Sequence, residues 1–311
     1  MDPGYLLQQT INFLTIGAIY ALIALGYTMV YGIIELINFA HGDVFMVGSF
    51  VTLTVLTTLG GTLGFDGAIS NPLLLAVVLI VTFLVAMAVM GIVGVLIERF
   101  AYRPLRNAPR LAPLITAIGM SFILQNVVQV IWGPSPVIVP QIIDVHAAIR
   151  IGDASIRYLS LFIIALAVVL MIALQVFVRQ TRLGRAMRST AIDREAAMLM
   201  GVDINTTIAL TFFIGSALAG AAGVVQGLYF GNTVFTIGFQ AGLKAFTAAV
   251  LGGIGNTTGA ALGGFLIGFI EVASTVVGFS RWSEAIVFSI LVLVLVFRPT
   301  GILGQQLAER A

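Results

Sequence analysis

The chain has 311 residues, of which 59% are hydrophobic and 9% are charged. A soluble globular domain carries roughly 25% charged residues, so this composition excludes one and indicates an integral membrane protein. The formal net charge of +2 gives no reason to expect a nucleic acid partner, and the absence of cysteine excludes disulfides, iron–sulfur clusters and thiol chemistry.

Apolar runs long enough to cross a bilayer recur along the chain. A helix needs about 20 apolar residues to span the hydrocarbon core. The runs lack the alternation of apolar and polar residues found in barrel strands, so they predict helices. The first run has no basic segment before it and no small-residue cleavage site, so we expect a retained span and not a signal peptide. The expected spans are 11–31, 36–59, 72–97, 111–132, 158–178, 206–230, 258–278 and 283–297.

Basic residues predict which side of the membrane each loop faces. Arginine clusters at 99–110 and 179–194 are separated by two expected spans, so both lie on one side. Cytoplasmic loops are rich in Lys and Arg, which places both clusters in the cytoplasm. The loop 133–157 then faces outside, as does the N-terminus, which carries Asp2 and no basic residue.

The last third of the chain needs one more crossing to satisfy the same rule. Three spans after residue 205 would leave Arg298 and Arg310 outside. The conflict disappears if residues 242–254 cross or insert as a short helix. The alternative is a weak exception to the charge rule. We therefore expect an all-α bundle of about eight or nine membrane segments, with a discontinuous or re-entrant helix and a cytoplasmic coupling helix.

Polar residues at membrane depth follow the first span, in residues 35–43. Such residues are usually functional or paired. Asn38, His41 and Asp43 either shape part of a translocation path or stabilise a helix break through side-chain bonds. A lone histidine in this setting is more often structural. The only other histidine, His146, falls in the outer loop, so no metal site is expected.

The fourth span carries polar residues at helical spacing. Ser121, Gln125 and Gln129 recur every four residues and therefore share one face. This stripe either lines a path for a zwitterion or bonds to neighbouring helices. A proton-driven carrier usually has carboxylates deep in several spans, and here only Glu271 comes close. The other polar residues within the spans are Asn12, Asn126, Gln226 and Lys244.

The polar segment 179–205 predicts a short cytoplasmic helix near its end. Thr190 is the expected N-cap, with Asp193 three residues on as in a capping box. Asp193 and Glu195 complement the positive end of the helix dipole. Gly201 is the expected stop.

The exposed face of this helix is suited to contact with another protein. Ala196 and Ala197 permit close approach, and Met198 can adapt to an apolar cleft. The form Glu195-Ala-Ala-x-x-x-Gly201 resembles the docking loop of ATP-binding-cassette (ABC) importer permeases, although no Ile-x-Leu-Pro element follows it. The alternative is a helix lying on lipid headgroups, which the nearby arginines would favour.

A glycine-rich segment follows the short helix expected at 242–254. Gly252, Gly253, Gly255 and Asn256 predict a helix break, which is tolerated at membrane depth where protein surrounds it. The four-residue spacings of the glycines that follow are typical of closely packed transmembrane helices. A phosphate-binding loop is excluded because the Gly-x-x-x-x-Gly-Lys pattern is absent. The spaced glycines are Gly259, Gly263, Gly264 and Gly268.

Taken together, five segments closely resemble the "H"-type permease of high-affinity branched-chain amino acid ABC importers. The resemblance covers essentially the whole chain and implies one transmembrane permease domain, 1–311, with its coupling loop at 179–205. It also implies ATPase coupling through Asp193, Glu195, Ala196, Ala197 and Gly201. The segments are YALIALGYTMVYGII at 20–34, INFAHGD at 37–43, ERFAYRPLR at 98–106, KAFTAAVLGGIGN at 244–256 and RPTGILG at 298–304.

The same resemblance implies partners and a location. It implies a multi-pass protein of the bacterial inner membrane, a second related permease, two cytoplasmic ATPase subunits and a periplasmic binding protein that delivers Leu, Ile or Val. The chain is then a non-catalytic subunit that binds no cofactor, and ATP with Mg²⁺ is used by the partner ATPases. Permeases of the same family import urea or short amides, which is the main alternative. A secondary transporter would take up solute without ATP, and a channel would pass current in planar bilayers.

Overall fold

A computed structural model of the chain describes residues 3–36, 38–106, 108–109, 111–144, 147–152, 154–298 and 300–304. Asp2, Arg110, His146 and Arg310, which the sequence arguments used, lie outside the described residues. The described residues form a helical bundle with two small antiparallel β-ladders. The helices are α1 (Pro3–Ile34), α2 (His41–Leu63), α3 (Pro72–Ile97), α4 (Leu111–Trp132), α5 (Tyr158–Gln180), α6 (Arg182–Ile192), α7 (Arg194–Leu199), α8 (Ile204–Phe230), α9 (Ile237–Gly252), α10 (Thr257–Val276) and α11 (Ser283–Phe297).

Eight of these helices, in the part of the chain that is described, are long and apolar enough to cross a membrane. α9 is apolar but has 16 residues, which is about 24 Å of helix against a hydrocarbon core of about 30 Å. The prediction of an all-α membrane bundle with eight or nine segments is confirmed. The eight long helices are α1, α2, α3 with its extension to Leu105, α4, α5, α8, α10 and α11 with the turn before it.

Several predicted boundaries were wrong, among them the start of α1, which is Pro3 and not residue 11. α2 begins at His41 and not at residue 36, because Glu35 has a positive φ of 55° and directs the chain away from helical geometry. α9 begins at Ile237, five residues before the predicted start, so the loop between α8 and α9 is short. That loop contains β4 (Asn232–Thr233), which pairs with β1 (Val137–Ile138).

α1 and α8 form the centre of the bundle and bury most of their residues. Small residues let the helices approach closely. A Cβ on Gly268 of α10 would lie 2.6 Å from Cα of Gly17 in α1, so only glycine fits at this crossing. α4, α5 and α11 lie at the periphery, with apolar side chains turned outward as in a protein surrounded by lipid.

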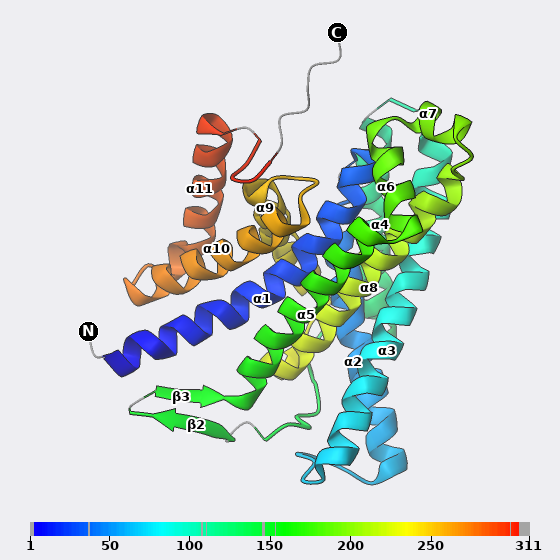
Figure 1. Cartoon of the computed structure of the whole chain (residues 1–311). Helices are drawn as coiled ribbons and strands as arrows, with labels where there is room; N and C mark the ends of the chain where they lie inside the picture. The colour runs from blue at the N-terminus through cyan, green and yellow to red at the C-terminus, as the bar shows by residue number, and fades with distance from the viewer. Residues whose placement is uncertain are drawn as a thin grey trace.

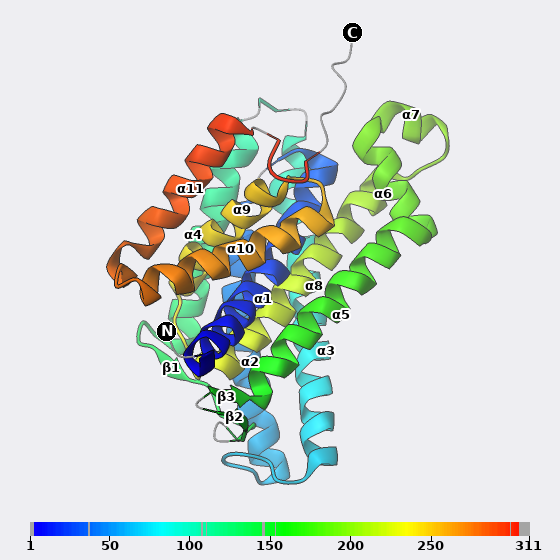
Figure 2. The same cartoon turned by 60° about the vertical axis from the view of Figure 1, so that its left-hand side comes forward.

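The loops gather at two opposite ends of the bundle (Figures 1 and 2). α6, α7 and the end of α11 lie at one end. The start of α1 and the hairpin of β2 (Ala148–Ile151) and β3 (Ala154–Arg157) lie at the other. In this arrangement α9 runs back towards the end of the bundle that holds α7. The distribution of basic residues leads us to expect such a short helix at 242–254. Which compartment each end faces stays a prediction.

Candidate functional site

The two short helices at one end of the bundle meet at Asp193. Its Oδ1 accepts hydrogen bonds from the N–H groups of Glu195 (2.9 Å) and Ala196 (3.0 Å), so Asp193 is the N-cap of α7. The predicted capping role of Thr190 was wrong. Thr190 is buried within α6, where its hydroxyl donates to the carbonyl of Ala186 in the preceding turn (2.8 Å), and the bend comes three residues later.

α7 stops where the sequence predicted. Gly201 adopts a φ of +84°, and its N–H donates to the carbonyl of Met198 (3.0 Å). A residue with a Cβ is strained in this left-handed conformation, whereas glycine is not. The stop therefore depends on residue type, even though there is open space around the position.

α7 has one side turned towards the protein and an apolar tip turned away. Ala197 is buried, whereas Met198, Leu199 and Met200 are 60%, 89% and 85% exposed. Figures 1 and 2 place α7 at the extreme end of the molecule. Three large apolar side chains gathered at an exposed tip are typical of a protein contact surface.

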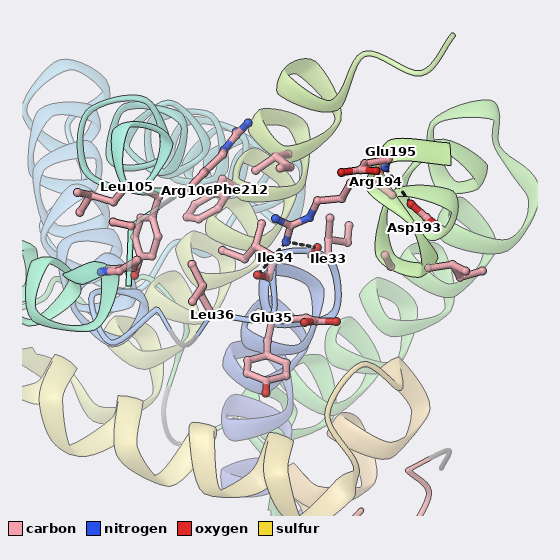
Figure 3. Close-up of a pocket in the computed structure, with 18 residues that line it drawn as sticks. Ile33, Ile34, Glu35, Leu36, Leu105, Arg106, Asp193, Arg194, Glu195 and Phe212 are labelled. Carbon is pink, nitrogen blue, oxygen red and sulfur yellow. Dashed lines mark hydrogen bonds between the residues drawn. The ribbon is translucent and has the colours of Figure 1, made fainter. Parts of the chain in front are cut away.

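Arg194, the first residue of α7, points back into the bundle (Figure 3). Its Nη2 donates hydrogen bonds to the carbonyls of Ile33 (3.3 Å) and Ile34 (3.0 Å), the last two residues of α1. These carbonyls have no partner within the helix, and a cation at a helix C-terminus is favoured by the dipole. Arg194 thus joins the exposed helix α7 directly to the central helix α1.

A cavity of about 760 Å³ opens between these elements. Figure 3 shows it bounded by the end of α1, by Arg194 and by Arg106 on the far side. Glu98 is buried and forms an ion pair with Arg106, which also donates to Oδ1 of Asn205 (2.7 Å) beside the start of α8. Because a buried carboxylate is stable only when paired, this contact fixes the segment after α3 against α8. Sequence reasoning noted the arginines here but not the pairing of Glu98.

Of the five residues predicted to line a path, the structure joins Asp43 and Gln125 by a side-chain hydrogen bond. Asp43 accepts hydrogen bonds from the Ser121 hydroxyl and from Nε2 of Gln125 (3.0 Å), which joins α2 to α4. Asn38 accepts from the Tyr102 hydroxyl (3.1 Å), on the side of the large cavity.

The two remaining path residues have different surroundings. His41 is buried against the Tyr27 ring, with 4.6 Å between the ring centroids. Gln129 is half-buried on α4, one turn beyond Gln125. Neither residue lines the cavity of about 760 Å³, and a role for them in translocation stays a prediction.

The glycine segment after α9 forms a sharp reversal. Gly253 and Gly255 have φ values of +108° and +88°, and Asn256 caps α10 through two hydrogen bonds to its Oδ1, of 3.0 and 3.2 Å. The carbonyl of Gly252 accepts from the N–H of Leu303 (3.0 Å). The predicted break therefore holds the segment after α11 against the end of α9.

Comparison with known proteins places the chain among transport permeases. A family model described as the permease component of branched-chain amino acid transport systems matches residues 9–295. The high-affinity branched-chain amino acid transport system permease protein BraD of Pseudomonas aeruginosa is 45% identical over 307 residues, covering 98% of this chain and 97% of the relative. LivH of Escherichia coli K12, described in the same words, is 44% identical over 309 residues, 98% of each chain.

A more distant relative carries a different printed substrate. The fructose import permease protein FruG of Bifidobacterium longum is 23% identical over 279 residues, covering 83% of this chain and 74% of the relative. No solved structure matches the chain.

Proposed function

Because the chain belongs to the family of permease components of branched-chain amino acid transport systems, we propose that it imports Leu, Ile or Val as the membrane subunit of an ABC importer. The relatives that cover almost the whole chain at 44–45% identity are described by this substrate class, and they support it over urea, short amides or a sugar. The chain is a multi-pass membrane protein, and the bacterial relatives support a place in the inner membrane.

A permease of an ABC system requires partner components, and we assign four to this chain. They are a second related permease, two cytoplasmic ATPase subunits that use ATP and Mg²⁺, and a periplasmic protein that delivers the amino acid. In this assembly the chain is non-catalytic and holds no cofactor. Its contribution is a path through the membrane and a surface that receives the motion of the ATPases.

The observation that carries this proposal is the construction of α7. Energy released outside the membrane must enter the bundle through an element that projects from it. α7 projects at one end, exposes Met198, Leu199 and Met200, and is joined to α1 through Arg194. Apolar side chains at the tip suit a cleft on a partner, and flexible methionines adapt to its shape.

The proposal is tested by reconstituting the complex in vesicles and measuring uptake. We expect ATP-dependent accumulation of labelled L-leucine that excess L-isoleucine and L-valine suppress and that urea does not. Accumulation of urea in place of leucine would assign the alternative substrate, and accumulation without ATP would contradict the coupling role.

A pair of variants tests whether the exposed tip of α7 binds the ATPases, separately from transport. Leu199→Asp places a charge at the exposed tip of α7, and we expect the ATPases to be lost during purification. Leu63→Asp, at the exposed far end of α2, is the matched control and should retain them. Retention of the ATPases by Leu199→Asp would contradict docking through α7.

A further inference from the structure

Three charged side chains meet among the last three helices of the bundle. Nζ of Lys244 on α9 lies 3.1 Å from Oε1 of Glu271 on α10 and 3.8 Å from Oε1 of Glu284 on α11. Lys244 also lies over the ring of Tyr20, 5.9 Å from its centroid. Two carboxylates facing one ammonium leave one negative charge in excess when both are ionised. Such groups within membrane segments are costly and mark functional sites by default.

The ion pair separates two cavities. Glu271 lines a cavity of about 450 Å³, and Lys244 lines a smaller one of about 160 Å³. Ile16 of α1 lines both. Lys244 and Glu271 therefore form part of the wall between them, and a change of partner for either residue would alter that wall.

The cavity of about 450 Å³ that Glu271 lines has a polar lining, unlike most of this apolar chain. Three amide side chains of α1 project into it and are joined to one another by hydrogen bonds of 3.2 and 3.3 Å. Arg157 is exposed on its rim and makes no ion pair among the described residues. Ile16 and Val272 add an apolar side. The amides are those of Gln8, Gln9 and Asn12.

An α-amino acid has three parts that the lining of such a cavity can bind. Its carboxylate requires a cation, and an arginine fork is well suited to it. Its ammonium requires an acceptor, and the carboxylate in this lining is that of Glu271, whose Oε1 accepts from Lys244. Its aliphatic side chain requires an apolar surface. The volume falls within the range of roughly 300–1,000 Å³ that holds small ligands.

We propose that this cavity is a transient site for a zwitterionic α-amino acid, with Arg157 facing the carboxylate and Glu271 the ammonium. The proposal rests on the proposed function, because it names a place within the permease for the transported amino acid. Binding of the ammonium competes with Lys244 for Glu271, so the site is weak, as a path that must release its solute requires. Lys244 then keeps Glu284 as a partner, and the wall towards the smaller cavity loosens.

The site is tested by ligand-observed NMR on the purified complex without its binding protein. The probes are L-leucine, leucinamide, which lacks the carboxylate, and 4-methylpentanoate, which lacks the ammonium. We expect L-leucine to bind most tightly of the three. Arg157→Gln and Glu271→Gln should each weaken L-leucine binding about tenfold or more, the effect of losing one charge-assisted contact.

Controls keep the test open if Glu271→Gln does not fold. Thr275→Trp fills the cavity from an exposed position and leaves the ion pair intact, so it should abolish binding. Arg281→Gln and Asp66→Asn change exposed charges that do not line the cavity and should bind as the wild type does. Unchanged binding in folded Thr275→Trp and Arg157→Gln would overturn the site, as would equal binding of all three probes. Leucine uptake by the wild-type complex is a separate result, so the site can fail while the proposed function stands.

Discussion

Replacement of Arg194 should separate ATP hydrolysis from transport. The side chain donates two hydrogen bonds to carbonyls at the end of α1, at 3.0 and 3.3 Å. A hydrogen bond from a charged donor contributes about 1.5–3 kcal/mol, and the dipole of α1 adds about 0.3–1 kcal/mol. Because Arg194 is only half-buried, we take about 2 kcal/mol for its contact with α1. Loss of that contact would weaken the link between α7 and α1 by roughly 30-fold.

The assay measures ATP hydrolysis and L-leucine uptake in the same vesicles. In Arg194→Ala the apolar tip of α7 is unchanged, so the ATPases should still co-purify and hydrolyse ATP, while leucine transported per ATP falls at least tenfold. Arg194→Lys should recover part of the loss, since it keeps a cation but not the fork. Arg185→Ala, an exposed arginine of the neighbouring helix α6, is the matched control. An unchanged ratio of leucine to ATP in Arg194→Ala would refute transmission through this contact.

Three further predictions follow from other parts of the fold. Gly201→Val forces a branched side chain into a left-handed conformation, which costs about 1–2 kcal/mol, and should lower uptake without preventing membrane insertion. In this cysteine-free chain, Ile138→Cys, at the end of the bundle predicted to face outside, should react with membrane-impermeant thiol reagents applied from outside. Ile302→Cys beside α9 should not, and labelling of both would contradict the predicted sidedness. Asp43→Ala removes the acceptor of the buried Ser121 hydroxyl and of the half-buried Gln125 amide on α4. It should destabilise the protein by about 3 kcal/mol, seen as a lower melting temperature in detergent, whereas Asp66→Ala in an exposed loop should not. Loss of uptake at an unchanged melting temperature would instead make Asp43 a residue of the path.

The eight long helices could be predicted from sequence because each is a long apolar run, and the stop at Gly201 because its chemistry is local. The contacts between helices could not. A helix that is apolar on all sides gives no signal for the face that it turns to its neighbours. The hydrogen bond from Arg194 to the carbonyl of Ile34 therefore could not be predicted from the order of apolar and polar residues, although Arg194 was noted as a basic residue. The start of α2 at His41 was missed because the backbone change occurs at a single ordinary residue, Glu35.

The two proposed sites are connected by one helix. α1 ends at the carbonyls held by Arg194 and, nearer its start, contributes Gln8, Asn12 and Ile16 to the cavity proposed to bind an amino acid. Between these points its residues are almost all buried, and Gly17 meets α10 without space for a Cβ. A closely packed helix moves as a body and bends little, because its neighbours leave no room for local rearrangement. A displacement of α7 by an ATPase would therefore reach the wall of the cavity through α1, whereas a loosely packed helix would absorb it. The Arg194 variants test this directly: if α1 transmits the motion, Arg194→Ala lowers leucine uptake and leaves leucine binding at the proposed amino acid site intact.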